Sequence, residues 1–340
     1  MKRHKICKII LAILAVFLCV AFYELIGICI TYKKQPAVSD ATIKETQNIM
    51  SVAGRENTER AVIIEKNSQA LLERVRLIQN AKDEIILSTF AFKSDESGKL
   101  ILGALHDAAD RGVHVRILVD GMESWIDMEG NPYFYGLSSH ENVEIKLYNK
   151  ANPLKPWKTM GRMHDKYLIA DGKIYILGGR NTYNYFLGDF PGHKNFDRDV
   201  LVVCDEPQKD NSVNQLWNYF ETIWEQEDCR YFHNSKKLAD RQSVKKAVLE
   251  LQEGYQQYFE VNKEKICDTD YADETFETEK ITLLSNPIHT QAKEPVVWYQ
   301  LGELMKNAKE RVKIHTPYII CNDMMYNTWE EIAQKVPDFS

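Results

Sequence analysis

The sequence predicts an α/β fold in which a mixed sheet is flanked by helices, together with an N-terminal transmembrane helix and an incomplete second copy of the fold. Three observations support this prediction. Strand-like runs alternate with helical periodicities over residues 61–207, a long apolar stretch stands near the N-terminus, and a ten-residue segment recurs 227 residues later. Strands that alternate with helices imply a sheet covered on both faces. A length of 340 residues favours two domains.

The N-terminal stretch, residues 9–30, is apolar apart from Glu24. About twenty such residues can cross a bilayer at a rise of about 1.5 Å each. More basic residues precede the stretch than follow it, which favours a cytoplasmic N-terminus. A cleaved signal peptide is the alternative, but the stretch is long for one and no A-x-A-like site follows it. We therefore expect residues 1–34 to be a single-pass anchor in the cell membrane, with the rest of the chain extracytoplasmic.

The remaining elements follow in order. A polar linker is expected over residues 35–60, a first domain over 61–207 and a helical link over 208–280. Within the first domain the pattern predicts a helix from residue 68, a helix over 98–111, and strands over 84–92, 113–119, 143–147, 166–170 and 173–177. A strand-like run over 281–284 then opens residues 281–340.

An internal repeat suggests what residues 281–340 are. Residues 80–89 align with residues 307–316, and both segments read Asn-Ala-Lys at the end of a helical pattern before a strand that ends at Thr. The C-terminal segment is therefore expected to be the start of a second domain. A histidine equivalent to His164 would fall near position 391, so we interpret the chain as truncated before a second motif.

The candidate site lies in the pattern H-x-K-x(4)-D-x(6)-G-G-x-N. Because strand side chains alternate between faces, His164 and Lys166 are expected on one face. Asp171-Gly172 is a hairpin signal, so a second strand should return to the same end. The alternative is a plain hairpin with a surface histidine and lysine, which does not account for the spacing of the later residues. The fixed positions are His164, Lys166, Asp171, Gly178, Gly179 and Asn181.

This segment resembles the HKD signature of the phospholipase D superfamily, and its Gly-Gly-x-Asn ending resembles the cardiolipin synthase branch. The resemblance implies a phospholipase D-like α/β sandwich. It also implies that His164 attacks phosphorus to form a phosphohistidine, and that Lys166 and Asn181 hold the non-bridging oxygens. A second histidine, from a second half or from a homodimer, would protonate the leaving alcohol. No metal and no cofactor are implied.

Two more carboxylates belong to the expected catalytic set. Asp171 stands at the hairpin turn, where we interpret it as bonding local backbone. An imidazole nucleophile also needs a carboxylate on its other nitrogen. Asp199 is favoured for that role over Asp197, because it stands at the mouth of the strand over residues 200–203. The alternative is that both are solvated turn residues.

A basic run with one tryptophan, Trp157, leads into the motif. It is either a solvated face or a loop that contacts an anionic phosphate, and Trp157 could lie at a membrane interface. Two residues from this run join the glycines and a strand-end threonine in the expected substrate-binding set, which is Lys158, Arg162, Gly178, Gly179 and Thr316. For Thr316 the alternative is a strand-terminating turn.

Composition narrows the function. A net charge of −6 argues against a general nucleic-acid binder. The seven cysteines show no C-x-x-C pair, so a zinc site is not expected. We expect a membrane-anchored enzyme that acts on phospholipids, with phosphatidyl transfer as in cardiolipin synthesis favoured. A nuclease of the same superfamily and a catalytically inactive fragment are the alternatives.

Overall fold

The computed structural model describes residues 2–51, 59–152, 154–208, 210–316 and 318–340. It contains two compact units. The sheet unit is Glu56–Ile281, and the discontinuous unit combines Met1–Arg55 with Thr282–Ser340.

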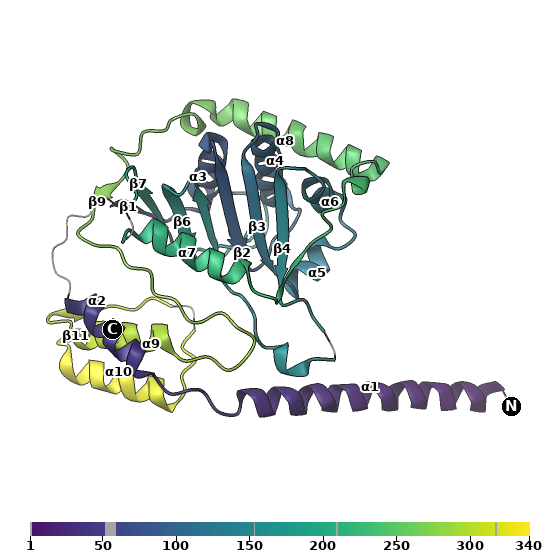
Figure 1. Ribbon diagram of the computed structural model, residues 1–340, viewed down its shortest axis with the longest axis horizontal. Helices are drawn as coiled ribbons and strands as arrows, with labels where there is room; N and C mark the ends of the chain where they lie inside the picture. Colours follow the sequence, from purple (N-terminus) through teal and green to yellow (C-terminus); the bar gives the residue numbers. More distant parts are fainter. Residues whose placement is uncertain (1, 52–58, 153, 209, 317) are drawn as a thin grey trace. The chain divides into compact units, whose positions relative to one another are not determined.

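A mixed sheet forms the centre of the sheet unit, as expected (Figure 1). Across the described residues the strand order is β8-β4-β3-β2-β5-β6-β7-β1-β9. Strands β2, β3 and β4 run parallel, whereas the other neighbours are antiparallel. The bounds are β1 Glu59–Ile64, β2 Glu84–Thr89, β3 His114–Asp120, β4 Val143–Tyr148, β5 Tyr167–Ala170, β6 Ile174–Gly178, β7 Asp199–Cys204, β8 Cys229–Tyr231 and β9 Phe276–Glu277.

Helices cover both faces of this sheet (Figure 1). Along β3, Val115 and Ile117 lie in the main core, while Arg116 between them points to the aromatic rings of α7. This alternation places α7 (Ser212–Trp224) on the face opposite to α3 (Asn67–Asn80), α4 (Glu96–Asp110), α6 (Pro132–Ser138) and α8 (Gln242–Ile266). Residues 208–280 are largely helical, as expected. Helix α7 packs on the sheet, whereas α8 packs on α3, α4 and α6, and both belong to the sheet unit.

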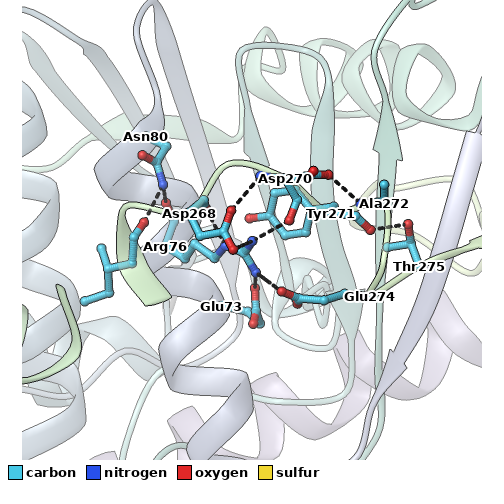
Figure 2. A network of polar contacts seen from close by, with 10 residues as sticks. Glu73, Arg76, Asn80, Asp268, Asp270, Tyr271, Ala272, Glu274 and Thr275 are labelled. Carbon is cyan, nitrogen blue, oxygen red and sulfur yellow. Dashed lines mark hydrogen bonds and ion pairs between the residues drawn. The ribbon is translucent and has the colours of Figure 1, made fainter. Parts of the chain in front are cut away.

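One arginine fastens the segment that follows α8 to α3 (Figure 2). The Arg76 guanidinium donates to the carbonyls of Asp268 (2.7 Å) and Asp270 (2.9 Å), and it pairs with Glu274 at 3.0 Å. It also lies 3.9 Å from the centre of the Tyr271 ring. Burial raises the pKa of neighbouring Glu73. The chain therefore reaches β9, at the edge of the sheet, along a fixed path.

The discontinuous unit holds the apolar N-terminal helix. Within α1 (Lys2–Tyr32), Lys5–Tyr32 is long and apolar enough to cross a membrane, and its described side chains are largely exposed. The expected linker contains α2 (Asp40–Ser51), and its residues 52–58 lie outside the described part of the chain. The other elements are α9 Val296–Lys306, β10 Arg311–Val312, α10 Asp323–Lys335 and β11 Asp338–Phe339. The expected strand over 281–284 is wrong, since these residues pair with no strand among the described residues.

The internal repeat recurs in the structure with the same offset. Strand β2 starts at Glu84 and β10 starts at Arg311, which is 227 residues later. The Asp95 side chain caps α4 and the Asn322 side chain caps α10, again 227 residues apart. In each copy the strands before and after the helix pair in parallel. Both segments are therefore βαβ units with matching helix signals.

Candidate active site

The candidate site lies at one edge of the large sheet. The carboxyl ends of β2, β3 and β4 meet there with the amino ends of β5 and β7 and the carboxyl end of β6. The expected hairpin is confirmed as β5 paired with β6. Asp171 and Gly172 both have positive φ, +52° and +61°, as a tight hairpin turn requires. His164 and Lys166 enter β5 at the site edge, and Gly178 returns to it.

His164 and Lys166 face each other at this edge. Lys166 Nζ lies 3.0 Å from His164 Nδ1 and donates to the His164 carbonyl at 2.6 Å. The Phe90 ring lies against both, 4.5 Å from the imidazole and 5.3 Å from Lys166 Nζ. Burial lowers the pKa of Lys166 to about 8. Partial burial and the Lys166 ammonium lower the pKa of His164 against the opposing charge of Asp120, so the imidazole is neutral near pH 7.

Asp120 is a site residue that the sequence analysis missed. Its fully buried carboxylate accepts from the Met163 backbone N–H (3.1 Å) and from Arg162 Nε (3.0 Å) on one side. On the other side it accepts from the Met122 N–H at 3.0 Å, at the start of α5 (Glu123–Met128). Asp120 therefore holds the residue directly before His164. The signal in the sequence was an aspartate directly after the expected strand over residues 113–119.

Two further contacts order the surroundings of the motif. Asn181 accepts a hydrogen bond from the Ala91 N–H (3.1 Å), which fixes the amide beside the end of β2. Asp165 accepts from the Tyr219 hydroxyl of α7 (2.8 Å).

Asp171 lies away from the site. It sits at the opposite ends of β5 and β6, where its carboxylate accepts from the backbone N–H groups of Lys82, Asp83 and Glu84 at 2.8–3.0 Å. These bonds join the hairpin turn to the start of β2. The structural interpretation of Asp171 therefore holds, and its place in the catalytic set is corrected.

Asp199 also differs from expectation. It is buried and ion-paired with Arg74 (2.9 Å) and Arg180 (3.2 Å), both nearly inaccessible, whereas His164 Nδ1 faces Lys166. The two arginines hold the carboxylate because a buried charge needs paired, hydrogen-bonded partners. Arg180 also donates to the backbone carbonyls of Ile64 and Asp197. Asp197, the alternative, accepts from the Arg198 N–H.

The two glycines make room for carboxylates. A Cβ on Gly178 would lie 2.0 Å from Asp199 Oδ1, and one on Gly179 would lie 2.0 Å from Asp197 Oδ2. We expected them to allow close approach of a substrate. The space beside each backbone is filled by an aspartate of the chain instead.

The expected basic contacts are largely occupied. Lys158 is ion-paired with Asp228, and Arg162 is held by Asp120 and the Asn149 carbonyl, so both cations already have partners within the chain. Both had been expected to bind substrate. Thr316 belongs to the discontinuous unit, where its hydroxyl donates to the Tyr318 carbonyl. Among the described residues, no group of three or more His, Cys, Asp or Glu side chains is placed to hold a metal ion.

Comparisons with known proteins agree with this architecture. Residues 75–224 match the family described as "Cardiolipin synthase, PLD-like domain". An uncharacterized protein of Helicobacter pylori is 27% identical over 307 residues, which cover 82% of this chain and 58% of that protein. Cardiolipin synthase C of Escherichia coli is 29% identical over 154 residues, which cover 41% of this chain and 31% of the synthase. The chain thus spans little more than half of the length of one relative and about a third of the other.

One solved structure shows the same fold over most of the chain. Phosphatidylserine synthase of Haemophilus influenzae superposes with a TM-score of 0.56 and 14% identity, covering 87% of this chain and 64% of that protein. At this identity the likeness concerns the fold alone.

Proposed function

Because residues 75–224 of this chain are a phospholipase D-like domain, as the motif led us to expect, we propose that the protein is a membrane-anchored enzyme that cleaves or transfers phospholipid phosphodiesters. Transfer of a phosphatidyl group, as in cardiolipin synthesis, is the preferred reaction. The similarity to cardiolipin synthase C and a helix able to span the membrane both support a lipid substrate. The excess of basic residues before that helix favours an extracytoplasmic catalytic domain.

The contact between His164 and Lys166 carries the proposal. A neutral imidazole keeps the lone pair that a nucleophile needs, and the adjacent ammonium can bind an anionic phosphate. When a phosphodiester oxygen accepts the hydrogen bond from Lys166 Nζ, the lone pair of His164 is free to attack. The hydrogen bond between Lys166 and His164 is thus replaced by one between Lys166 and the substrate.

The reaction then proceeds in two displacements. An imidazole nitrogen of His164 forms a bond to phosphorus, and the bond from phosphorus to the leaving alcohol breaks. The leaving oxygen lies opposite the attacking nitrogen, so its proton must come from an acid on the far side of phosphorus. We assign that acid to a second half or a second copy of the chain. An acceptor alcohol or water, deprotonated by the same group, then displaces His164 and restores the free imidazole.

In both steps, Lys166 and Asn181 bind the non-bridging oxygens of the phosphate. The Asn181 carbonyl oxygen is fixed by the Ala91 N–H, so its amide group has a set orientation beside the histidine strand. Pre-oriented donors stabilise the developing charge at phosphorus without reorganisation.

The test uses the full chain in phosphatidylglycerol nanodiscs. Cardiolipin and released glycerol are measured by mass spectrometry, and acid-labile phosphate on His164 is sought after rapid quenching in alkali. We expect His164→Ala to abolish both signals and His114→Ala to retain them, because His114 lies at the opposite end of β3. Turnover of the His164→Ala protein within about tenfold of the parent would falsify the assignment.

A further inference from the structure

We propose that the His164 edge of the sheet unit is also a docking face for the surface of an anionic phospholipid bilayer. This inference rests on the proposed lipid substrate and adds the surface that meets the membrane. The docking face is defined by four apolar and two basic residues, Trp125, Ile126, Leu154, Met160, Lys150 and Lys155.

The apolar members are unusually exposed for side chains of their size. Trp125 is 59% exposed, Ile126 74%, Leu154 77% and Met160 58%. They lie in the two segments that follow β3 and β4, neighbouring parallel strands whose carboxyl ends form the site edge. Apolar side chains that gather on one exposed edge mark an interaction surface.

The two segments are fastened to each other and to His164. Gly121 donates its N–H to the Tyr148 carbonyl at 2.7 Å, and it has no room for a Cβ because Lys150 backbone atoms lie within 2.7 Å. Asp120 binds the start of the first segment and the end of the second. The docking face and the nucleophile are therefore held in one fixed arrangement.

Charge favours a lipid surface as the occupant. Residues 149–163 contain four basic residues and no acidic ones, although the whole chain carries −6. Lys158 and Arg162 are ion-paired, whereas Lys150 and Lys155 form no ion pair within the described residues. These two lysines line a cavity of about 290 Å³, whose other charged side chains are the basic Lys158 and Arg230 and the acidic Glu227 and Asp228. On the neighbouring segment, Asp127 and Glu129 are paired with Lys93 and His233, whereas Glu123 forms no ion pair within the described residues.

This composition matches that of interfacial membrane contacts. Tryptophan and aliphatic side chains enter the headgroup region, and lysines interact with anionic lipids. Docking in this orientation would bring headgroup phosphates to the edge that carries His164. The alternative partners of this face are a second copy of the chain and a nucleic acid.

Because α1 alone can hold the chain in a membrane, vesicle binding would not test the docking face. The test therefore measures how deeply the side chains of the docking face enter the bilayer. The full chain is placed in nanodiscs whose lipids carry bromine on the acyl chains, and tryptophan quenching is compared between variants. We expect Trp125→Phe to remove part of the quenching, while Trp217→Phe on α7 leaves that part intact. The double variant Lys150→Glu, Lys155→Glu should weaken the Trp125 signal about fivefold per lysine in anionic bilayers and leave it unchanged in neutral ones. Lys263→Glu on α8 is the charge control.

A second arm compares turnover of bilayer phosphatidylglycerol with that of a short-chain monomeric analogue. The double variant Ile126→Ser, Leu154→Ser should lower the ratio of these rates on the order of tenfold. The control Val261→Ser, exposed on α8, should not change it. Quenching of Trp125 in a chain that turns over no lipid would support docking and refute the proposed function. Lipid turnover without a Trp125 signal would refute docking but not the proposed function. Docking would also be refuted if Trp125→Ser abolished a dimer of the chain or its binding to single-stranded DNA, because the face would then bind that partner instead.

Discussion

The carboxylate of Asp120 accepts a hydrogen bond of 3.1 Å from the backbone N–H of Met163, the residue directly before His164. Asp120 thereby sets the path of the chain that presents the nucleophile, and its charge also acts on the imidazole, whose pKa it raises against burial and Lys166. Since β3 is an interior strand, the position of His164 is tied to a strand that is paired on both sides.

This relationship predicts a kinetic effect of Asp120→Asn. An amide can still accept one of the N–H groups but loses the charge that pairs with Arg162. We expect kcat to fall by between about tenfold and 100-fold with little change in KM, because the nucleophile is misplaced and the ground-state contacts remain. Steady-state kinetics and melting temperature are measured together. A rise in KM at constant kcat would assign Asp120 to substrate binding instead.

The pH dependence should be bell-shaped. The imidazole must be neutral, so activity rises with pH through the lowered pKa of His164, below its ordinary value of about 6.5. The ammonium must be charged, so activity falls as pH passes the Lys166 pKa of about 8. Lys166→Arg should lower the rate and remove the Lys166 contribution to the alkaline limb, because a guanidinium stays protonated, while the limb of the proposed second acid remains. Profiles of kcat/KM between about pH 5 and pH 10 test this, and an alkaline limb of unchanged shape and midpoint in the arginine variant contradicts it.

Gly178→Ala should destabilise the domain by about 1–3 kcal/mol, because its Cβ would collide with Asp199 Oδ1 and with backbone. Gly254→Ala on α8 is the matched control, since a Cβ there meets nothing within 4 Å. A helical glycine replaced by alanine should gain about 0.5–1 kcal/mol. Denaturant unfolding in detergent measures both changes, and equal stabilities would show that the glycine is not sterically required.

Asp199→Asn should cost about 3–5 kcal/mol of stability, since it leaves the guanidinium groups of Arg74 and Arg180 buried without their counter-charge. The loss should appear as a lower melting temperature. If the variant melts like the parent but shifts the acidic limb of the pH profile, Asp199 acts on His164, as the sequence had suggested.

Local signals predicted much of this fold. The hairpin followed from two apolar runs around Asp171-Gly172, and α1 followed from its apolar length, because neighbouring residues determine each. The partners of Asp199 did not follow, since Arg74 comes from a helix 125 residues away in sequence. Basic residues such as Arg162 could be recognised as candidates, but only tertiary structure shows that buried carboxylates already bind them.

The order in which the chain is synthesised bears on how the two units form. The sheet unit is continuous in sequence and can fold as soon as residue 281 has emerged, whereas α2 must wait for the segment around α9. The Ser39 N–H and hydroxyl reach Glu294 only after a loop of 255 residues has closed. The entropy of loop closure grows slowly with loop length, so this long loop lowers the stability only slightly. It slows folding much more, because contacts between distant residues form late. A folded sheet unit shortens the effective loop, which makes its folding the kinetic prerequisite for assembly of the segments on either side.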